Sequence, residues 1–418
     1  MKILKTFYKE GVKAVCIIFI VCLLIPIMYQ RGECQNVVKV GIVLPFTGSL
    51  APIGKSCFQG TEFAVNEING KGGIRSLNGA KLVLVKGDSE GKAEVGMSEV
   101  ERIAGEGVVA FFGAYQSAVT FAVTQVAERQ KIPWIVPISI ADNITDRGFK
   151  FVFRINNKSS EYIPRTLEMI NRLIEHQKLQ KKPITMAMLY ENTLYGQSLN
   201  KDIKNLSESG ELLKKYNLKL VDEASYPHTT SSLSTELTKL KSANPDLLFA
   251  VSYISDAILL VRTMQELKFN VMGIYITGGG FGDDQLIKSL GKTSEYVLGS
   301  EHWAPGKHPD LNARFMKQYG VRLDGNAVKY YTGAYVLKDA LERTASTDRI
   351  KIRDALAKTR LTDHVLPFGV IEFDQTGHNP NVYQVIDQIR DGKYQTIFPT
   401  KYSSIPPGFP VPKWEDRK

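Results

Sequence analysis

Residues 47–56 (TGSLAPIGKS) contain the residue types of a nucleotide-binding loop. The segment follows an apolar run, ends in Gly-Lys-Ser and precedes a helical pattern. A phosphate-binding loop needs four residues between its first glycine and the Gly-Lys pair, because its backbone N–H groups must surround the phosphates. Here five residues separate Gly48 from Gly54, and one of them is Pro52. The spacing therefore argues against a nucleotide site.

Other catalytic and metal-binding patterns are missing from the sequence. The glycine-rich residues 277–284 (TGGGFGDD) lack the G-x-G-x-x-G order, although glycines after a strand allow close approach by a ligand or form a tight turn. The six histidines are scattered, and no H-E-x-x-H or G-x-S-x-G pattern occurs. Asp283 and Asp284 fit the negative charges expected at a helix N-terminus. We therefore predict no catalytic residues, no metal site and no cofactor.

A ligand-binding position is suggested by residues 111–130 (FFGAYQSAVTFAVTQVAERQ). An apolar run ends at Phe112, and small or polar residues lead through Ser117 into a helical pattern. In open α/β sheets, ligands bind outside the carboxyl ends of the strands, and helix N-termini there attract carboxylates. Ser117 could donate its hydroxyl to such a ligand, or it could be an ordinary helix N-cap. Position alone leaves both interpretations open.

The elements that must position these residues alternate between strands and helices. Predicted strands cover residues 40–44, 81–86, 108–112, 134–137, 151–154, 184–190, 218–226, 246–251 and 273–279. Predicted helices follow several of them, at residues 93–106, 117–130, 196–209, 233–242 and 257–267. Repeated alternation of this kind predicts an α/β fold with parallel sheets covered by helices. Two such runs in one chain predict two lobes, and the proline-rich residues from 399 onward are expected to lie extended on the surface.

The N-terminus has the composition of an export signal. Four lysines precede an apolar run at residues 14–29, which is shorter than a typical membrane span. We expect residues 1–33 to be a signal sequence with an uncertain cleavage site, although a retained anchor stays open. Cys34 and Cys57 are the cysteines beyond it, and neither their pairing nor a lipid on Cys34 follows from the sequence. The net charge of +10 is spread without a basic stripe, so no nucleic-acid partner is expected.

Several motifs in order resemble the branched-chain amino-acid-binding (leucine/isoleucine/valine-binding-like) family of type I periplasmic solute-binding proteins of ABC transporters. The resemblance extends over residues 37–395. It rests on KVGIVLPFTG, the pattern from Gly54 to Ile74, AERQKIPWIVP, YENTLYGQSL, ANPDLLFAVSY and FGVIEFDQTGHN. It implies two Rossmann-like lobes joined by three crossovers, with the ligand in the cleft between them. Lobe 1 would comprise residues 34–157 and 304–361, and lobe 2 residues 158–303 and 362–418.

The same resemblance assigns ligand-binding positions. The family's serine that meets the ligand carboxylate falls on Ser117, and its two aromatic cleft residues fall on Tyr195 and Tyr253. Its small residue and threonine fall on two isoleucines that flank Ser139, which we include in the predicted site together with Gly279.

Gly279 is the position where this sequence departs from the family, which has a glutamate there for the ligand ammonium. A buried ammonium without a counter-ion is costly. We therefore expect a ligand that keeps a carboxylate or amide near Ser117 but lacks an ammonium, such as an aliphatic or aromatic carboxylate, an amide or a urea-like compound. Glu301 or Asp256 could supply a displaced acid, which would keep amino acids open.

The resemblance implies a binding protein that is not an enzyme. We expect an exported, periplasmic or extracytoplasmic monomer that captures a small solute by hinge closure and docks on ABC permease subunits in the membrane. Two alternatives remain at this stage. The same lobes could present a ligand to a membrane-bound sensor, and turnover of a compound would indicate an enzyme.

Overall fold

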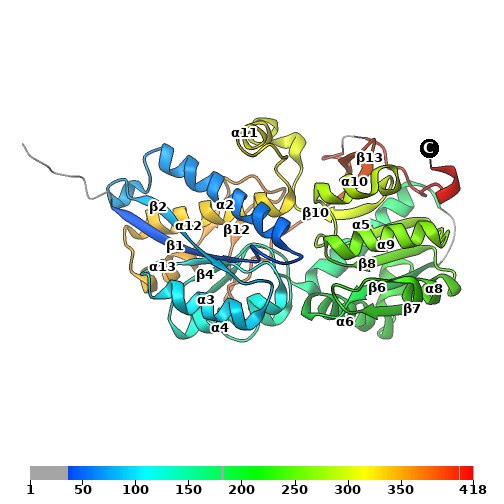
Figure 1. The fold of residues 1–418 in the computed structure, drawn as a ribbon, viewed down its shortest axis with the longest axis horizontal. Helices are drawn as coiled ribbons and strands as arrows, with labels where there is room; N and C mark the ends of the chain where they lie inside the picture. The colour runs from blue at the N-terminus through cyan, green and yellow to red at the C-terminus, as the bar shows by residue number, and fades with distance from the viewer. Residues whose placement is uncertain (1–35, 180–182, 404, 418) are drawn as a thin grey trace, which may run out of the picture.

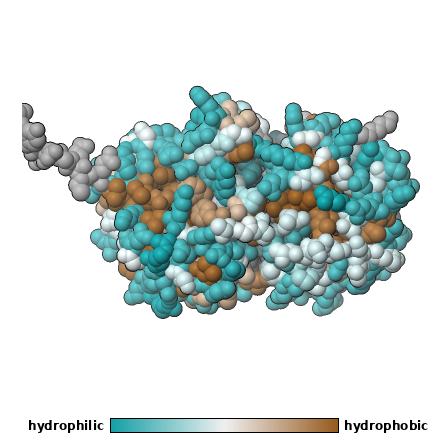
Figure 2. Space-filling model, in the orientation of Figure 1, coloured by the Kyte–Doolittle hydropathy of each residue, from teal (hydrophilic) through white to brown (hydrophobic). Residues whose placement is uncertain are grey.

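The structure, a computed structural model, describes residues 36–179, 183–403 and 405–417. The predicted signal sequence and Cys34 lie outside these residues. Figure 1 shows two lobes side by side, with β1 and β2 in the left lobe and the C-terminus on the right lobe. Most of the face seen in Figure 2 is hydrophilic, and hydrophobic residues show in smaller areas over both lobes.

The first lobe is built on a five-stranded parallel sheet in the order β2-β1-β3-β4-β5. Its strands are fully or largely apolar, as expected for a parallel sheet that is covered on both faces. Their bounds are β1 (Val37–Leu44), β2 (Lys81–Asp88), β3 (Phe111–Gly113), β4 (Trp134–Val136) and β5 (Val152–Arg154).

Five helices pack on this sheet or on one another, and two of them come from late in the chain. Gly60 allows α2 and α12 to approach closely, because a β-carbon there would lie 2.0 Å from the carbonyl oxygen of Ala327. Gly333 of α12 faces Phe112 of β3, so α12 belongs to the first lobe. The five are α2 (Ala51–Gly70), α3 (Ala93–Ala104), α4 (Ser117–Arg129), α12 (Gly325–Thr344) and α13 (Arg349–Leu356).

The second lobe contains a seven-stranded mixed sheet in the order β14-β13-β10-β9-β8-β6-β7. Strands β6 to β10 run parallel, and the late strands β13 and β14 join antiparallel at one edge. The strands are β6 (Ile184–Glu191), β7 (Leu218–Tyr226), β8 (Leu247–Val251), β9 (Gly273–Ile276), β10 (Leu298–Glu301), β13 (Val385–Arg390) and β14 (Lys393–Phe398). The helices are α5 (Ser159–His176), α6 (Leu194–Glu208), α7 (Glu211–Tyr216), α8 (Ser234–Ser242), α9 (Ile254–Glu266) and α10 (Asp284–Leu290).

The chain crosses between the lobes three times, as expected. It passes from β5 to α5, from β10 through α11 (Pro309–Tyr319) to α12, and from the small antiparallel pair β11 (Arg360–Leu361) and β12 (Ile371–Glu372) to β13. The ring of Phe373 lies 5.3 Å from that of Phe153, and His378 bridges to Arg154 of β5. Residues 371–379 therefore still contact the first lobe, later in the chain than the predicted boundary at 361/362. The short 3-10 helices are η2 (Arg75–Leu77), η3 (Asp142–Ile144), η4 (Gly291–Ser294), η5 (Pro305–Lys307) and η6 (Trp414–Asp416).

The α/β architecture predicted from the sequence is confirmed. None of the helices in the described part of the chain is both long and apolar enough to span a membrane. Cys57 is fully buried in α2 and pairs with no cysteine among the described residues, while Cys34 lies outside them.

Candidate functional site

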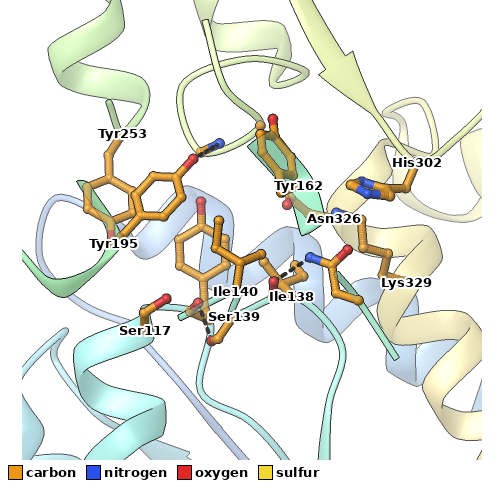
Figure 3. A pocket seen from close by; sticks show the side chains of 14 residues that line it. Ser117, Ile138, Ser139, Ile140, Tyr162, Tyr195, Tyr253, His302, Asn326 and Lys329 are labelled. Carbon is orange, nitrogen blue, oxygen red and sulfur yellow. Dashed lines mark hydrogen bonds between the residues drawn. The ribbon is translucent and has the colours of Figure 1, made fainter. Parts of the chain in front are cut away.

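A cavity lies where the strand ends of the two sheets face one another (Figure 3). The space inside it that is open to the centre of a water molecule is about 40 Å³, so the two lobes already lie close together around it. Both lobes contribute to its wall, since residues that follow β3, β4 and β5 meet residues that follow β8, β9 and β10. The lining residues are Tyr115, Ser117, Ile138, Ser139, Ile140, Asn156, Tyr162, Tyr195, Tyr253, Gly278, Gly279, His302, Asn326 and Lys329.

Ser117 lies in this cavity with its hydroxyl proton available. It is the first residue of α4, whose N-cap is Gln116, and no side chain caps that helix. Ser117 is therefore not the N-cap serine that the sequence had left open. Its Oγ accepts a hydrogen bond from the backbone N–H of Ala141 at 3.4 Å, so the O–H can still donate to a ligand. The unpaired N–H groups of the first turn of α4 favour an anion beside it.

Ser139 also lines the cavity, but its hydroxyl is engaged within the protein. It donates to the carbonyl oxygen of Tyr115 at 2.7 Å and lies 2.6 Å from Oγ1 of Thr120. Thr120 in turn accepts from the backbone N–H of Ala114. This chain of hydrogen bonds holds the backbone that carries Tyr115. The side chain of Ser139 thus supports the wall and has no proton left for a ligand.

Three tyrosine rings form an aromatic wall. The ring centroid of Tyr253 lies 5.5 Å from that of Tyr195 and 6.1 Å from that of Tyr115. The hydroxyl of Tyr195 is 2.6 Å from Oγ1 of Thr277 and accepts from the N–H of Gly279, so this residue presents its ring to the cavity. Burial raises the pKa of the Tyr253 hydroxyl well above its usual value, which keeps it neutral.

Gly279 lies in the wall where the family resemblance placed an acid. A β-carbon there would be 2.9 Å from the carbonyl oxygen of Ser252 and 3.0 Å from Cε1 of Tyr195. Any side chain would force a neighbour to move. Tyr195 packs closely over the backbone of Gly279 and occupies the space that an acidic side chain, the counter-ion of a ligand ammonium, would need.

Neither of the two acids considered as replacements lines the cavity. Asp256 is buried in α9 and pairs with Nδ1 of His228 at 2.9 Å. The carboxylate of Glu301 lies against the backbones of Gly282 and Gly325, where a β-carbon at either glycine would overlap it. The described lining of the cavity therefore contains no carboxylate.

The side of the cavity opposite Ser117 carries polar residues that were not predicted from the sequence. Figure 3 shows His302, Asn326 and Lys329 gathered there, away from Ser117, Tyr195 and Tyr253. Nε2 of His302 lies 2.8 Å from Oδ1 of Asn157. Asn326 and Lys329 come from α12, and the only sequence signal for them is a lysine inside an apolar helical run. Long-range packing, which no local pattern reports, brings α12 to the cavity.

Lys329 is the only lysine or arginine in the described lining of the cavity. It is 7% exposed, and burial lowers the pKa of its ammonium. Burial and the nearby Lys329 together hold the pKa of His302 well below its usual value, so this ring is neutral. The cavity therefore combines hydrogen-bond donors, aromatic surface and one cation, a composition suited to holding an anionic small molecule. No group of metal-ligating side chains occurs among residues 36–179, 183–403 and 405–417.

Two α/β lobes around a small-molecule cavity define the molecule as a two-lobed binding protein. A family model described as "Periplasmic binding protein" matches residues 37–393. The chain belongs to this family, whose members are substrate-binding proteins and not enzymes, so the resemblance inferred from the motifs is confirmed.

Similar proteins agree with this membership. "Leu/Ile/Val-binding protein homolog 7" of Brucella suis biovar 1 (strain 1330) is 30% identical over 377 residues, which cover 87% of this chain and 91% of the relative. The fold is similar to a leucine-binding protein, LivK, from Thermotoga maritima, with a TM-score of 0.74, 24% identity and coverage of 86% and 97% of the two chains. It is also similar to a solute-binding protein from R. palustris in complex with benzoate, with a TM-score of 0.73, 18% identity and coverage of 86% and 95%.

Proposed function

We propose that this protein is the extracytoplasmic substrate-binding component of an ABC importer and that its ligand is a small carboxylate without an ammonium group. The observation that carries the ligand class is the charge of the cavity, where Lys329 is a cation and the described lining contains no acid. An amino acid would bury its ammonium without a counter-ion, at a cost of several kcal/mol. A carboxylate alone meets the Ser117 hydroxyl and the N-terminus of α4.

Solved structures with this fold contain ligands of both kinds, with and without an ammonium group. The R. palustris protein is described in complex with benzoate, and a LivJ protein from Streptococcus pneumoniae, with a TM-score of 0.74 and 18% identity, in complex with isoleucine. Ser117, Ser139, Tyr195, Tyr253 and Gly279 all line the cavity, and we propose them as the ligand-binding set, with Ser139 acting through the position of Tyr115.

The remaining parts of the proposal concern the cell. Residues 1–33 act as the export signal, closure of the lobes buries the ligand, and the closed form docks as a monomer on membrane permease subunits. Ligand favours the closed form only as far as it binds that form more tightly. No turnover of the ligand is expected.

Thermal unfolding of the purified mature protein tests the ligand class. The panel contains leucine, isoleucine, valine, amides, urea, and aliphatic and aromatic monocarboxylates. A ligand at 100 times its dissociation constant adds about 2.7 kcal/mol to the folded state, which moves a melting curve clearly. We expect shifts with carboxylates and none with the amino acids.

Two serine variants connect the shift to the site. Ser117→Ala should reduce the carboxylate shift and lower the stability of the free protein less than Ser139→Ala does, because the one hydrogen bond that it removes, from the N–H of Ala141, is long at 3.4 Å. Ser139→Ala should lower the stability of the free protein by about 1–3 kcal/mol, because it leaves a buried carbonyl unpaired. A shift with leucine alone would contradict the proposed ligand class.

A further inference from the structure

Lys329 is a buried lysine of α12 that lines the cavity. Its ammonium makes no hydrogen bond and no ion pair within 4.0 Å of any residue that the structure describes. A lysine that is 93% removed from solvent is normally paired. Since its side chain lines the cavity, the space that remains for a partner is the cavity itself.

Glu301 is the acid whose charge acts most strongly on Lys329. It is nevertheless not bonded to Lys329 as a counter-ion. Its carboxylate lies against the backbones of Gly282 and Gly325, outside the lining of the cavity. Burial raises the pKa of Glu301, which favours its neutral form, and no ion pair of 4.0 Å or less joins its carboxyl to the ammonium of Lys329. The charge of Lys329 is therefore left for a group that enters the cavity.

Ser117 and Lys329 lie on opposite sides of the cavity, as Figure 3 shows. Ile138 and Ile140 lie between them and form an apolar wall, and Tyr115 also lines the cavity. The Tyr115 hydroxyl is itself buried and has no hydrogen-bond partner among the described residues, so it can donate to a ligand. Two anion-binding ends with an apolar wall between them match a ligand with an anionic group at each end.

We propose that Lys329 binds a second carboxylate of the ligand, so that the substrates are small dicarboxylates that extend from Ser117 and the N-terminus of α4 to Lys329. This inference rests on the proposed function, because it assumes that the first carboxylate lies at Ser117. The apolar spacer of the ligand lies along Ile138, Ile140 and the tyrosine rings. Lys329 is then the residue that sets specificity, and Asn326 beside it on α12 lines the same end.

Calorimetric titration of the mature protein with matched acids tests the inference. Each dicarboxylate from succinate to pimelate, and each benzene dicarboxylate, is compared with the monocarboxylate of the same skeleton. At least one dicarboxylate should bind on the order of tenfold or more tightly than its monocarboxylate, as expected for a buried charge pair. Lys329→Met should abolish this difference by weakening the dicarboxylate by about tenfold or more beyond any effect on the monocarboxylate.

Lys338→Met is the matched control, because Lys338 lies on the same helix outside the cavity, close to Glu342. It should change neither affinity. If every dicarboxylate bound no better than its monocarboxylate, the inference would be overturned. This comparison uses the unaltered protein, so it can be made even if Lys329→Met does not fold. Equal weakening of both acids by Lys329→Met would also overturn it, while binding of monocarboxylates would leave the proposed function standing. If leucine bound and no acid without an ammonium group bound, both the inference and the proposed function would be overturned.

Discussion

At the scale of single residues, Gly279 leaves no room for an acidic side chain at its position in the wall of the cavity. Its backbone is covered by the ring of Tyr195, and the N–H of Gly279 donates to the hydroxyl of that tyrosine. The resemblance to the family implies that an acid is missing from this position. The structure adds the physical reason, since no side chain fits there without displacing Tyr195 or the backbone at Ser252.

Adding a side chain at Gly279 should therefore destabilise the protein. We expect Gly279→Ala to lower the free energy of unfolding by about 1–3 kcal/mol through overpacking, and Gly279→Glu to lower it further without creating leucine binding. Gly278→Ala is the control, because the nearest atom to a β-carbon there is 3.6 Å away. Chemical denaturation of the three variants checks this, and an equal loss of stability in both alanine variants would contradict it.

The carboxyl of Glu301 should make stability depend on pH. Its pKa is raised from 4.5 to about 8 by burial, so the folded state binds a proton more tightly than the unfolded state. Stability is then highest below about pH 4.5 for this group and falls as pH rises toward 8. Asp283 and Asp387, with pKa values raised to about 6, act in the same direction at lower pH.

Glu301→Gln isolates this contribution. The free energy of unfolding of the unaltered protein should fall between pH 6 and pH 8, and the variant should lose most of that fall. Denaturation curves at several pH values measure it. An identical slope in both proteins would show that Glu301 is ionised throughout and that Lys329 already has its counter-ion.

At the scale of elements, α12 connects the stability of the first lobe with the site. Its N-cap, Asp324, accepts hydrogen bonds from the backbone N–H groups of Asn326 at 2.9 Å and Ala327 at 2.7 Å. A second carboxylate oxygen accepts from Ser56 Oγ of α2 at 2.7 Å. The first two turns of α12, which carry Asn326 and Lys329, are therefore held in place by this one side chain.

Removal of the cap should weaken both stability and binding. We expect Asp324→Ala to cost about 1–2 kcal/mol of stability and to lower the affinity for carboxylates, because the cavity-facing turns lose their anchor. Asp348→Ala removes the N-cap of α13, which accepts from the N–H of Lys351 at 2.9 Å and lies outside the cavity lining. It should cost a similar amount of stability and leave affinity unchanged. Equal affinities for the two variants would contradict a role of α12 in the site.

Local sequence patterns predicted the elements well and the site in part. The predicted helix start at Ser117 and the strand start at Trp134 coincide with α4 and β4, because apolar periodicity and turn residues are local signals. The role of Ser139 was harder to foresee, since its hydroxyl is engaged by Tyr115 and Thr120 through tertiary contacts. Lys329 was missed because α12 reaches the cavity only after the chain has crossed the lobes twice.

At the scale of the whole molecule, the account depends on two lobes that meet around one small ligand. Facing strand ends supply a donor from one side and a cation from the other, and the described wall offers no acid. We propose that a ligand stabilises closure more strongly when its charges match both ends of the cavity, because it then binds the closed form more tightly. The groups that would meet the ligand therefore come from both lobes, and no single sequence motif includes all of them.

The most direct test of this account is calorimetric titration of the mature protein with leucine and with 4-methylpentanoate, which has the same skeleton without the ammonium. The account predicts that 4-methylpentanoate binds and that leucine binds at least about 100-fold more weakly, in line with the cost of a buried ammonium that has no counter-ion. Tighter binding of leucine would contradict it and would mean that an acid outside the described lining reaches the ligand.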